Sequence, residues 1–104
     1  MSALIWCPFP DEKAAEAAAM TLLDEQLIAC ANLLGPMRSL FEWHGERGTG
    51  QEIGVLFKTD AALLDAAIAR IAELHPYDTP AVLGWPAHAA PSTAAWLGGL
   101  TGAA

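Results

Sequence analysis

The stretch His75-Pro76-Tyr77-Asp78-Thr79-Pro80 decides how the second half of this 104-residue chain is folded. A proline cannot continue a helix, and it pushes the residue before it toward extended geometry. We therefore expect a helix to end at about His75 and an extended segment to begin at about Pro80. The result is a stiff elbow that carries an imidazole, a phenol and a carboxylate between a helix and a strand.

The elements around this elbow follow from the spacing of the apolar residues. In the first half we expect a strand over 3–7, a helix over 12–27 capped by Asp11, and a strand over 28–43 with a bulge at Gly35-Pro36. A hairpin loop over 45–50, a strand over 53–59 and a helix capped by Thr59 or Asp60 follow. Beyond the elbow we expect a strand over 82–85, broken by Pro86, and a helix over 91–97.

This βαββαβ order predicts an α+β fold, the ferredoxin-like sandwich of an antiparallel sheet with two helices on one face. A short C-terminal helix completes it, and residues 1–104 are expected to form one domain. The hairpin of the second and third strands is long for so small a fold. It carries Phe41 and Trp43 outward near its tip, beyond the reach of two helices. An unpaired ribbon of this kind favours association unless something covers it.

The composition is rich in apolar residues, which make up 54% of the chain, whereas charged residues make up 16%. Ordinary soluble domains carry about 25% charged residues. Frequent alanine runs are one explanation, and coverage of apolar surface by other subunits is the second. Composition alone leaves both explanations open.

The charge pattern and the cysteine content exclude several classes of protein. The formal net charge is −7, and the five basic residues are scattered, so we expect no nucleic-acid partner. Two cysteines, Cys7 and Cys30, are too few for a disulfide framework and indicate a reducing compartment. The sequence shows neither the features of a signal peptide nor an apolar run long enough to span a membrane. We therefore expect a cytoplasmic protein without a membrane partner.

Several segments together resemble the CutA family, the divalent-cation tolerance proteins. The segments that carry the resemblance are 7–12, 25–32, 38–45, Lys58-Thr59, the elbow 75–80, and Trp96-Leu97. The same element order extends over nearly the whole chain. The resemblance implies a non-enzymatic protein of the response to metal ions, built as a tight homotrimer whose long hairpins bridge neighbouring subunits. It also implies that Phe41 and Trp43 lie in the interface between subunits.

Cys7 and His75 are the candidate metal ligands of the sequence. A thiolate and an imidazole suit copper or zinc, and the resemblance matches both positions to residues implicated in copper binding. The alternative is that Cys7 is a buried apolar thiol and that His75 caps its helix. The chain departs from the family at Ala81, where a glutamate is usual, so one potential carboxylate ligand is missing.

The other candidate residues have binding or structural roles rather than catalytic ones. Tyr77 and Asp78 of the elbow are the candidate binding residues, with the Tyr77 hydroxyl hydrogen-bonded in the elbow or across an interface. His44 is interpreted as a solvated or interface histidine, and Cys30 as a packing residue. Nucleophile–base pairs and glycine-rich phosphate loops are missing from the sequence, so we expect no catalytic residues and no required cofactor.

Three functions remain open at this point. The first is a trimeric, non-enzymatic protein of divalent-metal tolerance that binds copper or a similar cation. The second is a signalling module resembling the PII-type trimers, with a small ligand in the clefts between subunits. The third is an enzyme that uses His75 and Asp78 as an acid–base pair.

Overall fold

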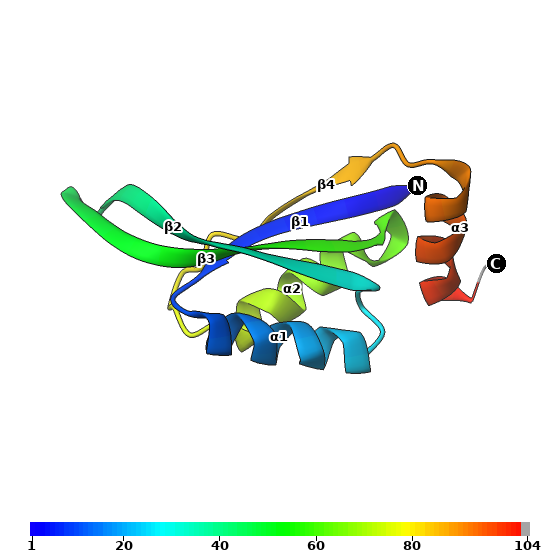
Figure 1. The fold of residues 1–104 in the computed structure, drawn as a ribbon, viewed down its shortest axis with the longest axis horizontal. Helices are drawn as coiled ribbons and strands as arrows, with labels where there is room; N and C mark the ends of the chain where they lie inside the picture. Colours follow the sequence, from blue (N-terminus) through cyan, green and yellow to red (C-terminus); the bar gives the residue numbers. More distant parts are fainter. Residues whose placement is uncertain (103–104) are drawn as a thin grey trace.

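The computed structural model describes residues 1–102 as a four-stranded sheet with helices on one face and at one end (Figure 1). In chain order the elements are β1 (Ser2–Phe9), α1 (Glu12–Asp24), β2 (Cys30–Trp43), β3 (Glu46–Asp60) and the 3₁₀ turn η1 (Ala61–Leu63). The remaining elements are α2 (Leu64–Leu74), β4 (Leu83–Ala87), α3 (Pro91–Gly98) and the 3₁₀ turn η2 (Gly99–Thr101). This order confirms the predicted βαββαβ sequence with a C-terminal helix.

The sheet has the strand order β2-β3-β1-β4, and every neighbouring pair is antiparallel. β1 lies in the interior of the sheet, where it pairs with β3 on one side and with β4 on the other. α1 and α2 both lie on the same face of this sheet (Figure 1). The predicted ferredoxin-like α+β sandwich is therefore confirmed.

The core forms between this face of the sheet and the two helices. In β1 the buried side chains alternate with half-exposed ones, so Ile5, Cys7 and Phe9 point toward the helices. The Phe9 ring meets Phe57 of β3 edge-on, with the ring centroids 6.4 Å apart. The small residues of α1, with Ala15 fully buried, let that helix lie close to the sheet. The core thus anchors the C-terminal end of β1, where the elbow also arrives.

Several predicted boundaries were wrong. α1 ends at Asp24 rather than near residue 27, because Gln26 turns the backbone to a φ of 58°. Leu27 still packs against the core, so the apolar spacing of the sequence continues beyond the end of the helix. β4 runs through Pro86 to Ala87, because an edge strand tolerates a residue without an N–H donor.

The hairpin loop is much shorter than predicted. β2 and β3 pair up to Trp43 and Glu46, so only His44 and Gly45 form the turn, with φ values of 52° and 79°. Two residues with positive φ are typical of a tight hairpin turn whose twist matches that of the strands. The expected bulge is confirmed by a register shift between Leu34 and Met37.

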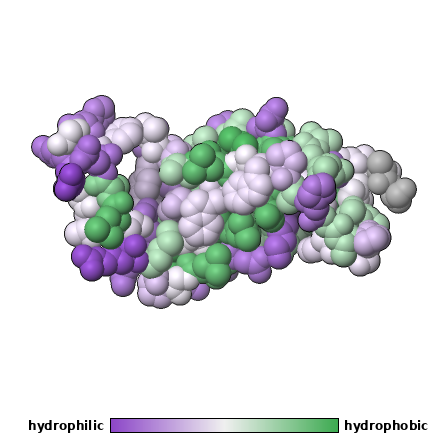
Figure 2. Space-filling model, turned by 90° about the horizontal axis from the view of Figure 1, so that it is seen from above, coloured by the Kyte–Doolittle hydropathy of each residue, from purple (hydrophilic) through white to green (hydrophobic). Residues whose placement is uncertain are grey.

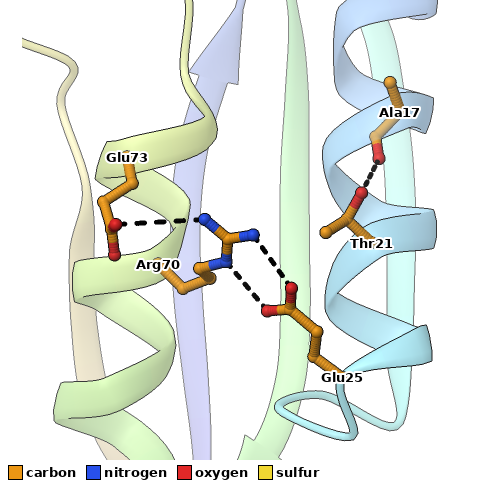
Figure 3. Close-up of polar contacts among 5 residues, drawn as sticks. All are labelled: Ala17, Thr21, Glu25, Arg70 and Glu73. Atoms are coloured by element: carbon orange, nitrogen blue, oxygen red, sulfur yellow. Dashed lines mark hydrogen bonds and ion pairs between the residues drawn. The ribbon is translucent and has the colours of Figure 1, made fainter.

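A cluster of charged side chains joins α1 to α2 (Figure 3). The Arg70 guanidinium of α2 donates two hydrogen bonds, of 2.8 and 2.9 Å, to the carboxylate of Glu25 at the end of α1. Glu73 lies 3.9 Å from the same guanidinium. In α1 itself the Thr21 hydroxyl donates to the Ala17 carbonyl at 3.1 Å. The hydrogen bonds from Arg70 hold the pKa of the Glu25 carboxyl below its usual range.

We expect the stabilising effect of Glu25 to depend on pH. Because the folded-state pKa is lowered, the contribution is present above the unfolded-state pKa of about 4.3 and is lost as the pH falls through the folded-state pKa. Glu25→Gln should therefore lower the free energy of unfolding at pH 7 and have little effect at pH 3, as measured by urea unfolding. Glu16→Gln, on the exposed side of the same helix, is the matched control. An equal effect of Glu25→Gln at both pH values would contradict this linkage.

The face of the sheet opposite α1 and α2 is largely uncovered. α3 contacts β1 and β3 at one end of it, and Leu97 is buried there. Elsewhere Leu83 and Trp85 of β4 are 60% and 44% exposed, beside half-exposed Trp6 and Leu56. Figure 2 shows this face, with apolar side chains along the middle of the sheet and hydrophilic ones at the hairpin tip. We call this surface, formed by Trp6, Leu56, Leu83 and Trp85, the open face.

Within residues 1–102, none of the helices combines the length and the apolar character needed to cross a membrane.

Candidate functional site

The elbow is fixed to the end of β1 by the ring of His75. α2 ends at Leu74, and His75 turns to extended backbone, because Pro76 prevents the helix from continuing. The His75 side chain is 7% exposed and its Nε2 lies 2.7 Å from the Pro8 carbonyl oxygen. Its Nδ1 accepts the backbone N–H of Tyr77 at 3.1 Å. A carbonyl only accepts, so these partners fit the neutral tautomer that carries its proton on Nε2.

Ring contacts complete the environment of His75. The imidazole stacks on Phe9 with a centroid distance of 4.4 Å and an angle of 27°, and it lies 4.7 Å from the Tyr77 ring. Both nitrogens of the His75 ring thus have hydrogen-bond partners, and one face of the ring packs against Phe9. The alternative that His75 caps its helix is supported in part. The backbone N–H of His75 caps α2, whereas the side chain bonds to Pro8 of β1 and not to the helix.

Cys7 reaches the same carbonyl oxygen. Its side chain is fully buried, and its Sγ–H donates to the Pro8 carbonyl at 3.6 Å. Burial, with a smaller contribution from the charge of Glu52, raises the pKa of the Cys7 thiol to about 12. The thiol is therefore protonated at neutral pH and has the character of a core residue.

The two candidate metal ligands are close together, but they do not fit a preformed metal centre. A metal ion needs a thiolate and an imidazole nitrogen with a free lone pair. Here the thiol is protonated, and His75 uses one nitrogen as donor and the other as acceptor. In the part of the chain that the structure describes, no group of three or more His, Cys, Asp and Glu side chains is placed to hold an ion. A metal site at Cys7 and His75 stays a prediction, and it requires the elbow to open or a second subunit to supply donors.

Tyr77 connects the elbow to the long hairpin. Its hydroxyl donates to Oε2 of Glu52, on β3, at 3.0 Å. Burial raises the pKa of Tyr77 to about 12, and the hydrogen bond and the charge of Glu52 act in the same direction. The phenol therefore stays protonated and continues to donate. Tyr77 is 41% exposed, so part of the residue remains accessible to solvent.

A groove with a volume of about 1030 Å³ runs between the elbow and the hairpin. Three aromatic side chains line it, Phe41, Trp43 and Tyr77. Three carboxylates line it as well, Glu42, Glu52 and Asp78. Ala81 also lies on its wall, so the position at which the sequence departs from the family pattern belongs to this groove. We call this feature the elbow groove.

The structure brings some predicted residues together and leaves others apart. Tyr77 and Asp78 both line the elbow groove, as does His44, whose ring meets Trp43 edge-on at 4.6 Å. Phe41 and Trp43 are 52% and 53% exposed, so the helices of their own chain leave them uncovered. That a neighbouring subunit covers them stays a prediction.

Two residues of the candidate site cannot be recognised from the sequence. Glu52 falls between the predicted loop and the predicted third strand, and nothing in its surroundings distinguishes it from a solvated glutamate. Pro8 acts through its carbonyl oxygen, which no sequence pattern reports. The proximity of both to the elbow depends on the pairing of β1 with β3, where Pro8 stands opposite Gly54.

The element order, the antiparallel 2-3-1-4 sheet and the long hairpin define a ferredoxin-like domain. This domain has a groove beside the elbow and an uncovered sheet face. The family model described as CutA1 divalent ion tolerance protein matches residues 3–99. The chain therefore belongs to the CutA1 divalent ion tolerance family, which confirms the resemblance seen in the sequence.

Individual relatives agree with this assignment. The divalent-cation tolerance protein CutA of Pyrococcus horikoshii is 42% identical over 80 residues, which cover 77% of this chain and 78% of that protein. The crystal structure of CutA from Xylella fastidiosa superimposes with a TM-score of 0.90 at 34% identity, covering 95% of this chain and 96% of the other. The structure of CutA from Archaeoglobus fulgidus, described as periplasmic, gives 0.90 at 26% identity and covers 96% and 98%.

Proposed function

We propose that this chain works as a homotrimeric, non-enzymatic protein in the tolerance of, or response to, divalent metal ions. Membership of the CutA1 family carries the link to divalent ions. The open face is the single structural observation that supports an oligomer. Monomeric proteins rarely expose a contiguous apolar surface of this kind. The cytoplasm, where two free cysteines are expected to stay reduced, is the proposed location.

The surface of the chain supports association with further copies. The open face places four large apolar side chains on one side of the sheet, and the hairpin tip adds Phe41 and Trp43. The strands β2 and β4 are the two edges of the sheet, so their outer backbone groups are available for pairing. The number of three subunits comes from the family resemblance.

The chemistry of the elbow supports a non-enzymatic role. His75 has a hydrogen-bond partner on each ring nitrogen, and the thiol of Cys7 and the phenol of Tyr77 hold their protons at neutral pH. The acid–base pair of His75 and Asp78 considered from the sequence therefore has no free imidazole nitrogen to work with.

The proposed cation is Cu²⁺ or a similar divalent ion. Cys7 and His75 are its proposed donors, with Tyr77 and Asp78 beside them on the elbow. Because the closed elbow does not fit a metal centre, binding at these residues requires the bonds of His75 to Pro8 and Tyr77 to be exchanged for a bond to the ion.

Two measurements test this proposal. Light scattering coupled to size-exclusion chromatography should give a mass of about three chains, and the mass of a single chain would overturn the trimer. Calorimetric titration with Cu²⁺ should show binding that is lost in Cys7→Ser and His75→Ala. Unchanged binding in both variants would remove these residues from the site, and absence of binding to the wild type would overturn the metal-binding part alone.

The second candidate is a PII-like trimeric module that binds a small ligand in a cleft between subunits. The elbow groove favours it, since a volume of about 1030 Å³ lies at the upper end of the range of ligand sites. Among residues 1–102, however, the lining of the groove includes no lysine or arginine that could hold a nucleotide phosphate.

A further inference from the structure

We propose that neighbouring subunits are joined by an ion pair between Lys58 of one copy and Glu52 of the next. This ion pair presupposes the proposed homotrimer, and it names the charged groups that fix how one copy sits on its neighbour. Lys58 and Glu52 both belong to β3, and both lie on the side of the sheet that α1 and α2 leave uncovered.

Lys58 is a cation beside the apolar middle of the sheet. It stands directly opposite Leu4 on β1, which in turn stands opposite Trp85 on β4, so the three side chains share one side of the sheet. Its neighbours along β3, Phe57 and Thr59, are fully buried on the other side. In the part of the chain that the structure describes, no carboxylate lies within ion-pair distance of its ammonium group. If the open face is buried between copies, this ammonium group is drawn out of water with it.

An ammonium group in such a contact needs a carboxylate, because a charge removed from water is costly unless a counter-charge meets it. On this side of β3 the carboxylates are those of Glu46, Glu52 and Asp60. Asp60 is already in use, since its side chain accepts the Ala62 N–H at 2.9 Å and caps η1. Glu46 lies beside the hairpin turn, far from the apolar middle of the sheet. Glu52 is the carboxylate that remains.

Glu52 is held ready to accept a cation. It lies two positions before Gly54, where any Cβ would overlap the Trp6 ring, so it borders the open face. The Tyr77 hydroxyl donates to its Oε2 at 3.0 Å, which fixes the carboxylate and leaves its other oxygen to accept from an ammonium group. Among residues 1–102, Glu52 has no ion pair. A group fixed in this way loses less entropy on binding than a free side chain does.

The positions of the two charges suit a ring of identical subunits. In such a ring each contact is heterologous, so one patch meets a different patch of the next copy. Lys58 and Glu52 are six positions apart along β3, about 20 Å at the usual rise of a strand, which is too far for a pair within one chain. Opposite charges at the two ends of one surface attract head to tail, and like ends repel.

A double-mutant cycle tests the ion pair. Lys58→Met removes the charge and keeps a long side chain, and Glu52→Gln removes the charge and keeps an acceptor for the Tyr77 hydroxyl. Light scattering of a dilution series measures dissociation of the assembly in a fixed concentration of urea, which does not screen charges as guanidinium does. Each single variant should dissociate at a concentration at least about tenfold higher than the wild type does. The double variant should be no weaker than the weaker single variant, because the first substitution already breaks the pair.

Glu46→Gln is the matched control, since it makes the same change on the same strand and the same side of the sheet. It should leave dissociation unchanged. Tighter assembly of Lys58→Met would show that the ammonium group has no carboxylate partner and would overturn the ion pair. Effects of Lys58→Met and Glu52→Gln that multiply independently would overturn it as well, and coupling of Lys58 to Glu46 would overturn the assignment to Glu52.

The mass of the wild type separates this inference from the proposed trimer. The mass of a single chain would overturn the trimer and the ion pair together. A trimeric wild type with uncoupled variants would overturn the ion pair alone.

Discussion

His75→Ala is expected to lower the free energy of unfolding by about 2–4 kcal/mol. The substitution leaves the Tyr77 N–H without its partner, and the Pro8 carbonyl keeps only the weak hydrogen bond from the Cys7 thiol. It also removes a ring that stacks on Phe9 at 4.4 Å. An unpaired buried polar group costs about 1–3 kcal/mol, and the cavity beside Phe9 adds to that cost. Chemical denaturation at one fixed protein concentration measures the effect, since oligomer stability depends on concentration.

The matched control is His88→Ala, because His88 is exposed in the segment that follows β4. It should change the free energy of unfolding by no more than about 0.5 kcal/mol. Hydrogen exchange locates the effect within the molecule: the amide of Tyr77 should exchange faster in His75→Ala and at the wild-type rate in His88→Ala. Equal stability of the two variants would show that the bridge between β1 and the elbow contributes little to the fold.

The elbow illustrates what the sequence can and cannot predict. The end of α2 was predictable to within a residue, because Pro76 acts on its immediate neighbours through local sterics. The role of the His75 side chain was not predictable, since its partner Pro8 is 67 positions away along the chain. Local rules fix local geometry, whereas the contacts of a side chain depend on how the strands are arranged.

The hairpin shows the same limit in another form. The segment 45–50 is rich in glycine, which is typical of a loop, and we predicted a loop there. In the structure Gly48 belongs to β3, where its missing side chain makes room for the Phe41 ring on the paired strand. A glycine that a turn requires and a glycine that a neighbouring ring requires cannot be distinguished before the strand register is known.

The chemistry of the site was predictable only as a set of residue types. Cysteine and histidine in one chain suggested metal ligands, and the fold does bring Cys7 and His75 to the same carbonyl oxygen. Burial and hydrogen bonding then decide what those residue types can do, and neither quantity can be read from the sequence. The acidic character of the elbow groove appeared only when β3 placed Glu52 beside Tyr77.

The second large effect is expected on assembly, from Trp85→Glu. Trp85 is 44% exposed on the β4 side of the open face, directly opposite Leu4 on the paired strand. If this face is buried between subunits, each copy of the variant brings a carboxylate into an apolar contact. Removal of a charge from water costs several kcal/mol per ion, and each 1.4 kcal/mol changes a dissociation constant tenfold. The mass measured by light scattering should therefore fall from about three chains to one.

Met20→Glu separates the loss of assembly from a general effect of added charge. Met20 is 53% exposed on α1, on the helical side of the molecule, so the same change there leaves the open face intact. That variant should keep the wild-type mass, and both variants should keep their helical signal in circular dichroism. A trimeric Trp85→Glu protein would show that the subunits meet elsewhere, with the hairpin tip and the sheet edges as the surfaces left to join them.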